Sequence, residues 1–143
     1  MAVLKLLKLL FLFLWQLPQN IIGGICVLSY LHYRTFFTSD GEIVELYFKN
    51  CFNGGISLGD TIILDDVYWE LFNLPDKALI MMIDHEHGHQ KQSRILGPLY
   101  LILIGLPSLI GSIVFKVFKI DRRHYFKLPW ERWADKLGGV KRG

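Results

Sequence analysis

The stretch of sequence with the clearest chemical meaning is His85-Glu86-His87-Gly88-His89, which satisfies H-E-x-x-H. Residues i and i+4 of a helix lie one above the other, so His85 and His89 aim their imidazoles at one point. Two imidazoles placed in this way are typical of a zinc site. Glu86 is displaced around the helix axis to the side of a metal-activated water, whose proton it can accept. His87 lies about 200° around the helix from His85 and cannot bind the same metal.

A catalytic zinc needs three protein ligands and one open position, so a third side chain must join the two histidines. Glu131 and Asp135 are the candidates, because they share one face of a helix predicted from Pro129 to Gly138. One carboxylate is expected to bind the metal, and the other to hold a histidine ligand through its second ring nitrogen. The spacing alone leaves open which carboxylate has which role.

The pattern His85-Glu86-x-x-His89 followed by Glu131-x-x-x-Asp135 resembles that of the gluzincin zinc metallopeptidases, in particular their membrane-bound Ste24/HtpX-like branch. It is also similar to small uncharacterised bacterial membrane proteins with this motif. The resemblance covers about residues 56–138. It implies one zinc ion per chain, with His85, His89 and Glu131 as ligands. It also implies that Glu86 is the general base and that Asp135 supports the ligands from a second layer.

The same resemblance implies how a substrate is held. Members of the family place the edge of a β-strand beside the motif helix, where it binds the substrate backbone. In this chain the counterpart is the segment Ile56, Ser57, Leu58 and Gly59. The expected substrate is therefore a peptide or a protein.

Two apolar runs flank these residues in the sequence. Neither 9–33 nor 95–115 contains a Lys, Arg, Asp or Glu, and each is long enough to cross a hydrocarbon core of about 30 Å as a helix. The hydrophobic fraction of 52% excludes a disordered chain, and the net charge of +3 is too small to indicate a nucleic-acid partner. The sequence predicts an integral membrane protein in contact with lipid.

The first apolar run is expected to bend near its middle. Pro18 removes a backbone donor and predicts a kink or break near Leu17. The carbonyl group that loses its partner would need another, which Gln16, Gln19 or Asn20 can supply. No small-residue cleavage site follows the run, so we interpret it as a retained anchor and not as a signal peptide.

The second apolar run contains Gly105 and Pro107, which are predicted to divide it into two halves. Each half is too short to span a bilayer alone, so the run is either one kinked spanning helix or a re-entrant hairpin. We favour the hairpin, because it lets Glu131 reach His85 and His89 without burying the charged residues 121–127 at membrane depth.

Between the runs, the sequence predicts a small antiparallel sheet and then the motif helix. Asp40-Gly41 indicates a hairpin turn, and a second strand or strand pair is expected over 56–64. Asn73 and Pro75 are typical of a helix start, and Gly97-Pro98 of a helix end. The predicted fold class is an α+β membrane protein with hydrophobic helices, a small antiparallel sheet and a zincin-like helix.

The chain is expected to form a single domain, 1–143. Its parts are an N-terminal anchor (1–33), the sheet (34–73), the motif helix (74–94), the broken apolar segment (95–118) and a basic tail (119–143). Residues 116–143 carry nine positive and three negative side chains, which is typical of a cytoplasmic surface. The expected location is a bacterial inner membrane with the site facing the cytoplasm.

The predicted function is zinc-dependent hydrolysis of peptide bonds. Two alternatives stay open on the sequence. In one, a metal holds the helices of a scaffold or partner-binding protein together without catalysis, as a closed four-ligand site would indicate. In the other, the same chemistry acts on a lipid. The sequence does not determine the oligomeric state.

Overall fold

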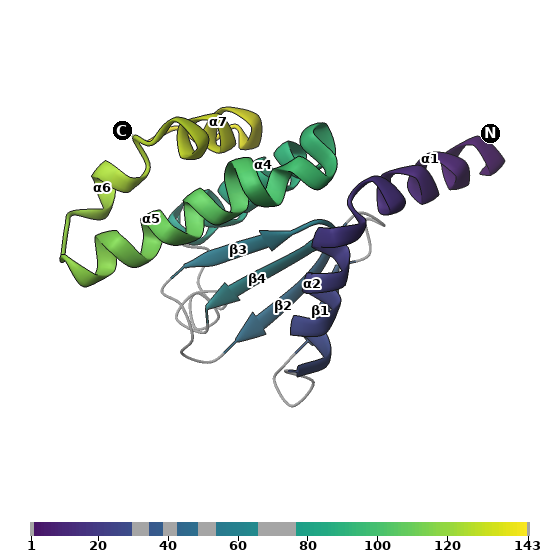
Figure 1. The fold of residues 1–143 in the computed structure, drawn as a ribbon, viewed down its shortest axis with the longest axis horizontal. Helices are drawn as coiled ribbons and strands as arrows, with labels where there is room; N and C mark the ends of the chain where they lie inside the picture. Colours follow the sequence, from purple (N-terminus) through teal and green to yellow (C-terminus); the bar gives the residue numbers. More distant parts are fainter. Residues whose placement is uncertain (1, 30–34, 39–42, 49–53, 66–76, 143) are drawn as a thin grey trace.

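The fold, seen in a computed structural model, combines helices with one small sheet (Figure 1). Residues 2–29, 35–38, 43–48, 54–65 and 77–142 are described. The helices are α1 (Ala2–Trp15), α2 (Leu17–Ser29), α4 (Lys77–Leu96), α5 (Leu106–Val117), α6 (Arg122–Tyr125) and α7 (Pro129–Gly138). The strands are β1 (Thr35–Thr38), β2 (Ile43–Phe48), β3 (Gly55–Leu58) and β4 (Thr61–Asp65). The expected mixture of helices and a small sheet is confirmed.

The four described strands lie in the order β1-β2-β4-β3. The pairs β1–β2 and β3–β4 are antiparallel, as the turn residues predict, although the Asp40-Gly41 turn itself lies outside the described residues. The central pair β2–β4 is parallel, with Val44 opposite Thr61, so the sheet is not antiparallel throughout. A turn motif specifies only its own hairpin and not how two hairpins join. Strand β3 lies at one edge of this sheet.

The break predicted in the first apolar run is confirmed. Helices α1 and α2 meet at Gln16 with a bend of 80°. Two of the side chains expected to compensate for Pro18 bond to α1, but not at the carbonyl of Leu14, which is the group that Pro18 leaves without its helical donor. Gln16 Nε2 donates to the carbonyl of Leu12 at 3.3 Å, and Asn20 Nδ2 donates to that of Phe13 at 3.1 Å. The Leu12 carbonyl also accepts from the backbone N–H of Gln16, so these bonds connect the corner to the last turn of α1.

The second apolar run does not break at Gly105 and Pro107, and that prediction is wrong. The bend of 120° lies at η2 (Gly97–Leu99), where Gly97 has a φ of +55°. Beyond it, η3 (Leu101–Gly105) is a π-helix that continues directly into α5. The wider π turn accommodates the missing donor of Pro107 within a continuous helix. A hairpin of helices therefore exists, but its corner lies at the end of α4.

Among the described residues, no single helix has both the length and the apolar composition to cross a membrane. Two bent pairs pass that test when taken together. They are Ala2–Trp15 with Leu17–Cys26, and Ile80–Leu99 with Leu101–Val117. Helix α4 extends two residues beyond its predicted end at Arg94, and its predicted start at Asn73 and Pro75 lies outside the described residues.

The two corners lie against each other. Trp15 Nε1 donates to the carbonyl of Arg94 at 3.2 Å, and Gln19 Nε2 donates to the carbonyl of Gly97. The α1–α2 corner thus gives the Arg94 carbonyl a donor in place of the N–H that Pro98 lacks, and it adds a second donor to the Gly97 carbonyl, which also accepts the N–H of Tyr100. On the next turn of α2, Asn20 Oδ1 accepts a hydrogen bond from the backbone of Asp60 at 2.9 Å, which places α2 against the β3–β4 turn.

Several polar side chains are fully buried, and many large apolar side chains are exposed. Fully buried side chains include Gln16, Gln19, Gln92, Ser93 and Glu131. Large apolar side chains on α1 and on the hairpin are exposed, with Leu4 at 78% and Val117 at 67%. Contiguous apolar surface of this extent marks a face that contacts a partner or a membrane.

Candidate metal centre

Helices α4 and α7 cross so closely that their backbones touch. A Cβ atom at residue 88 would overlap the carbonyl oxygen of Ala134 and lie 2.9 Å from its Cα, so only glycine fits. Helix α7 begins at Pro129 and ends before Gly139, which has a φ of +80°, as the sequence predicts. This crossing brings two segments that are far apart in the sequence into one site (Figure 1).

The structure places His85, His89 and Glu131 together, as the H-E-x-x-H and E-x-x-x-D spacings predict. Glu131 Oε2 lies 3.0 Å from Nε2 of His85 and 3.1 Å from Nε2 of His89. All three side chains are buried, and their ligand atoms lie within 4.8 Å of one another. A buried group of two imidazoles and one carboxylate with this convergence could hold a metal ion.

Each histidine is oriented through its other ring nitrogen. His85 Nδ1 donates to Asp135 Oδ1 at 2.7 Å, so Asp135 lies where a second-layer carboxylate is expected. Arg142 holds Asp135 in turn, with distances of 2.7 and 2.9 Å between its nitrogens and the two carboxylate oxygens. A donor at Nδ1 leaves the Nε2 lone pair of neutral His85 available for a metal.

The corresponding partner of His89 was not predicted. His89 Nδ1 donates to Gln92 Oε1 at 2.8 Å, and Gln92 Nε2 donates to the carbonyl of Trp130 at 2.8 Å. The second bond fixes which end of the amide faces the ring, so His89 also presents Nε2 to the cluster. The sequence feature that could have predicted this partner is the three-residue spacing from His89 to Gln92, which places both residues on one helix face.

The donor atoms fit a divalent cation. Glu131 Oε1 and Glu86 Oε2 are both buried, and neither has a hydrogen-bond partner among the described residues. Buried carboxylate oxygens are normally satisfied, so two orphaned oxygens beside one cluster indicate a site for a cation and for a polar group next to it. Nitrogen and carboxylate donors in this number suit zinc and related transition metals.

The electrostatics of the site keep its groups in different protonation states. Burial raises the pKa of Glu86 above its usual value, although His89 and His85 act in the opposite direction. Burial would also raise the pKa of Glu131, but hydrogen bonds from His85 and His89 hold it well below its usual value. Glu131 is therefore an anion that can bind a cation, and Glu86 is a carboxylate with raised proton affinity.

The metal-free protein should release about one proton for each zinc ion that it binds at neutral pH. Burial would lower the pKa of His85, but hydrogen bonds with Asp135 and Glu131 raise it to about 9. His85 is therefore protonated below that value, and zinc must displace the proton. The apparent zinc affinity should rise about tenfold per pH unit until it levels off above the His85 pKa. Calorimetry in two buffers of different ionisation enthalpy counts the protons, and a count of zero would contradict the assignment.

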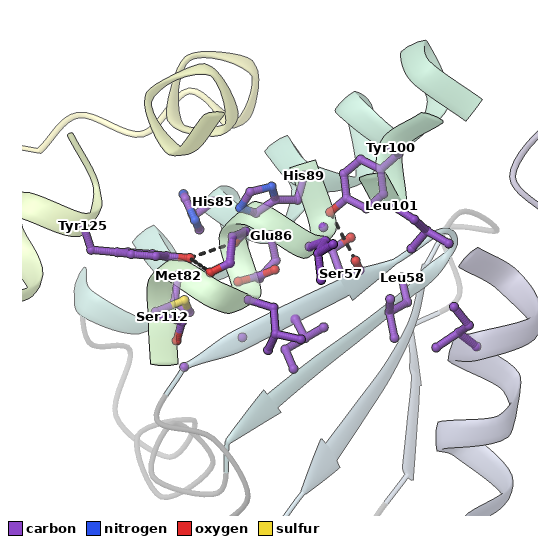
Figure 2. A pocket seen from close by; sticks show the side chains of 18 of the residues that line it. Ser57, Leu58, Met82, His85, Glu86, His89, Tyr100, Leu101, Ser112 and Tyr125 are labelled. Atoms are coloured by element: carbon purple, nitrogen blue, oxygen red, sulfur yellow. Dashed lines mark hydrogen bonds between the residues drawn. The ribbon is translucent and has the colours of Figure 1, made fainter. Parts of the chain in front are cut away.

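Glu86 lies at the floor of a cavity of about 580 Å³, between the histidines and strand β3 (Figure 2). Gly55 makes room for it, because a Cβ at that residue would come within 2.6 Å of the Glu86 side chain. Of the four residues predicted to bind substrate, Ile56, Ser57 and Leu58 line the cavity.

Gly59, the fourth residue predicted to bind substrate, is not among the residues that line the cavity. It forms the β3–β4 turn beside Asn20, with a φ of +63°. Of the two forms expected over 56–64, the structure has the strand pair, and the chain reverses direction at Gly59, where a positive φ is needed.

Two aromatic residues of the site were not predicted. The Tyr125 hydroxyl lies 2.7 Å from Ser108 Oγ and borders the cavity (Figure 2). The Phe126 ring meets the His85 ring edge-on, with centroids 5.3 Å apart, and Arg142 stacks on the other side of Phe126 at 3.4 Å. Only the return of the chain from α5 to α7 brings these side chains to the cluster, and no local pattern marks them.

His87 does not belong to the cluster of His85, His89 and Glu131, in agreement with its predicted position around the helix. In comparisons with known proteins, no family model, no curated protein and no solved structure matches this chain.

Proposed function

We propose that this protein is a membrane-embedded zinc peptidase, with one zinc ion held by His85, His89 and Glu131. The observation that carries the proposal is the buried Glu86 beside this group, which borders a large cavity and whose Oε2 has no hydrogen-bond partner among the described residues. The pattern of these residues along the chain, which resembles that of gluzincins, agrees with the same function.

Each residue of the site has a distinct role in the proposed hydrolysis. A bound zinc ion would lower the pKa of a water molecule and polarise the carbonyl of the scissile bond. Glu86 accepts the proton of the water and returns it to the departing amine, and its raised pKa suits both steps. Asp135 and Gln92 keep His85 and His89 in the tautomers that bind metal.

Strand β3 supports the choice of a peptide as the substrate. Tyr100 Oη donates to the carbonyl of Ser57 at 3.3 Å, so this carbonyl points away from β4 and toward the cavity. In an antiparallel pair the N–H and C=O of one residue point to the same side, so the N–H of Ser57 also faces outward. An extended peptide can pair with such an edge.

The exposed apolar helices support a membrane location. Apolar surface on α1 and α5 would be costly in water, whereas the buried glutamines at the α1–α2 corner satisfy backbone groups that lipid cannot. We place α1, α2 and the η3–α5 segment in the lipid as elements that enter from one face, and α4 with the metal site at the membrane surface. The exposed Lys116, Lys119 and Lys127 then lie near the headgroups, which favours the cytoplasmic face of a bacterial inner membrane.

A purely structural metal site is less consistent with this arrangement. Structural zinc sites have four protein ligands and no open position. Here three candidate ligands converge among the described residues, and His85, Glu86 and His89 border the cavity. An opening on this side is what a substrate needs.

The proposed function is tested by whether peptide cleavage depends on the metal and is restored with it. Purified protein loaded with one zinc per chain is incubated with a peptide mixture, and new chain ends are identified by mass spectrometry. Cleavage should cease when a chelator removes zinc and return when zinc is restored, while Glu86→Gln protein serves as the blank. Absence of cleavage by the loaded protein, or cleavage that survives chelation, would contradict the proposal.

A further inference from the structure

The cavity beside the metal cluster is larger than one side chain requires. Its volume of about 580 Å³ lies within the range of about 300–1,000 Å³ typical of pockets that enclose whole ligands. Its floor is polar and is formed by His85, Glu86 and His89 of α4. The occupant must therefore extend well beyond the bond that is cleaved.

The walls of the cavity are mostly apolar and come from several elements. They include Ile22 of α2, Ile56 and Leu58 of β3, Met82 of α4, and Leu106 and Leu109 of α5. Outside the cluster, Arg122 is the one charged side chain among the described lining residues. Polar or charged substrate side chains that face the apolar walls would lose hydration there without gaining partners.

The walls are continuous with the exposed apolar surface. Ile22 is 41% exposed, Leu106 53% and Ile102 66%, yet all three line the cavity. These residues lie on α2 and on the segment η3–α5, the same segments that we place in lipid. Apolar side chains of both segments therefore line the cavity and reach the surface of the molecule.

The cavity also offers groups that only a polypeptide would use. Strand β3 directs the N–H and C=O of Ser57 toward it, and the Ser57 hydroxyl is buried with no hydrogen-bond partner among the described residues. A lipid acyl chain would leave the N–H and the hydroxyl of Ser57 without partners, whereas an extended peptide can bond to both.

Resting on the peptidase function proposed above, we propose that the substrate is an apolar segment of a membrane-inserted polypeptide. This segment enters from the lipid between α2 and α5 and binds in extended form along β3. Soluble polar peptides are not its substrates.

Cys26 provides a test of occupancy that is independent of hydrolysis, because it lies on α2 and lines the cavity. In Glu86→Gln protein that also carries Cys51→Ser, Cys26 is the sole thiol. This protein is placed in vesicles of phosphatidylcholine and phosphatidylglycerol, and alkylation of Cys26 by N-ethylmaleimide is timed. Two probes of about 20 residues are compared, a Leu/Ala peptide with terminal lysines, which inserts into lipid, and a soluble Gly/Ser peptide.

The Leu/Ala peptide should slow alkylation about tenfold when its concentration is about ten times its dissociation constant, and the Gly/Ser peptide should have no effect. The matched control carries Cys26→Ser and Leu28→Cys, which moves the thiol to an exposed position on the same helix outside the cavity. Its alkylation rate should not change. If the Glu86→Gln protein does not fold, zinc-depleted protein with native Glu86 and the same Cys51→Ser change takes its place.

Three results would overturn the inference: no protection by the Leu/Ala peptide, equal protection by the Gly/Ser peptide, or equal slowing in the Leu28→Cys control. Protection by vesicles alone, relative to detergent, would identify an acyl chain as the occupant and would also overturn it. Protection of Cys26 without any cleavage by zinc-loaded wild type would contradict the peptidase function and leave this inference standing. Cleavage by zinc-loaded wild type without protection of Cys26 would support the peptidase function and contradict this inference.

Discussion

Replacement of Gly88 by alanine is expected to separate α4 from α7 and to abolish metal binding. The new Cβ would overlap the backbone carbonyl of Ala134, and a backbone atom cannot move aside as a flexible side chain can. Overpacking of this kind costs about 1–3 kcal/mol of unfolding free energy, and here the strain falls on the contact that brings Glu131 to the histidines. Zinc content and thermal unfolding of the purified protein measure both effects.

The matched control for this substitution is Gly24→Ala. Gly24 is also in a helix, but a Cβ there meets nothing within 4 Å. Alanine in a helix should stabilise by about 0.4–1 kcal/mol, so this variant should keep its zinc. Full zinc content and unchanged stability in Gly88→Ala would show that the α4–α7 crossing is not as close as described.

Replacement of Glu86 by glutamine is expected to reduce peptide cleavage about 10²–10⁴-fold while zinc stays bound. Glutamine has nearly the same shape, and Glu86 is not among the three converging ligand residues, so the metal site should persist. The amide cannot accept a proton from water, so the general-base contribution is lost. Rates of appearance of the cleaved peptides, with zinc determined on the same samples, measure the effect.

Asp84→Asn is the control for Glu86→Gln, since it removes a carboxylate from the same helix at a residue that does not line the cavity. Its cleavage rate should match that of wild type. Undiminished cleavage by Glu86→Gln would exclude Glu86 as the general base, and loss of zinc from that variant would make Glu86 a ligand instead.

The part of the site that follows helix periodicity could be predicted from the sequence. The i, i+4 spacing places His85 with His89 and Glu131 with Asp135, and each pair shares a helix face in the structure. What could not be predicted is how α7 crosses α4. That crossing depends on backbone contact at Gly88, and it brings side chains such as Tyr125 to the site without any local signal.

The fold was predictable where a residue type dictates the local backbone. Pro18 predicted the α1–α2 corner, and Asp40-Gly41 predicted the antiparallel pairing of β1 with β2, whereas the sequence left open whether 56–64 forms one strand or the observed pair. The second corner was misplaced because the sequence offers a glycine and a proline at two points, Gly97-Pro98 and Gly105 to Pro107. The π-helical turn of η3 accommodates Pro107 within a continuous helix, whereas the helix bends at Pro98. Only the three-dimensional structure shows which of the two prolines marks the bend.

The parallel pairing of β2 with β4 was not predictable for a related reason. Alternation of side chains and turn residues specify a strand and its hairpin partner, but not which strand lies next to a completed hairpin. In this protein the choice places β3 at the edge of the sheet, next to α4. The edge that the proposed function needs is thus set by a long-range pairing.

The central claim is that side chains from α4 and α7 bind one metal ion together, and the zinc content of Glu131→Ala tests it most directly. Wild type and this variant are purified in parallel without chelator, exposed to the same zinc, freed of excess and measured by mass spectrometry of the metal. Wild type should hold about one zinc per chain and Glu131→Ala far less than half of that, because two histidines alone bind weakly. A wild type without zinc, or a variant that keeps the full amount, would contradict the account.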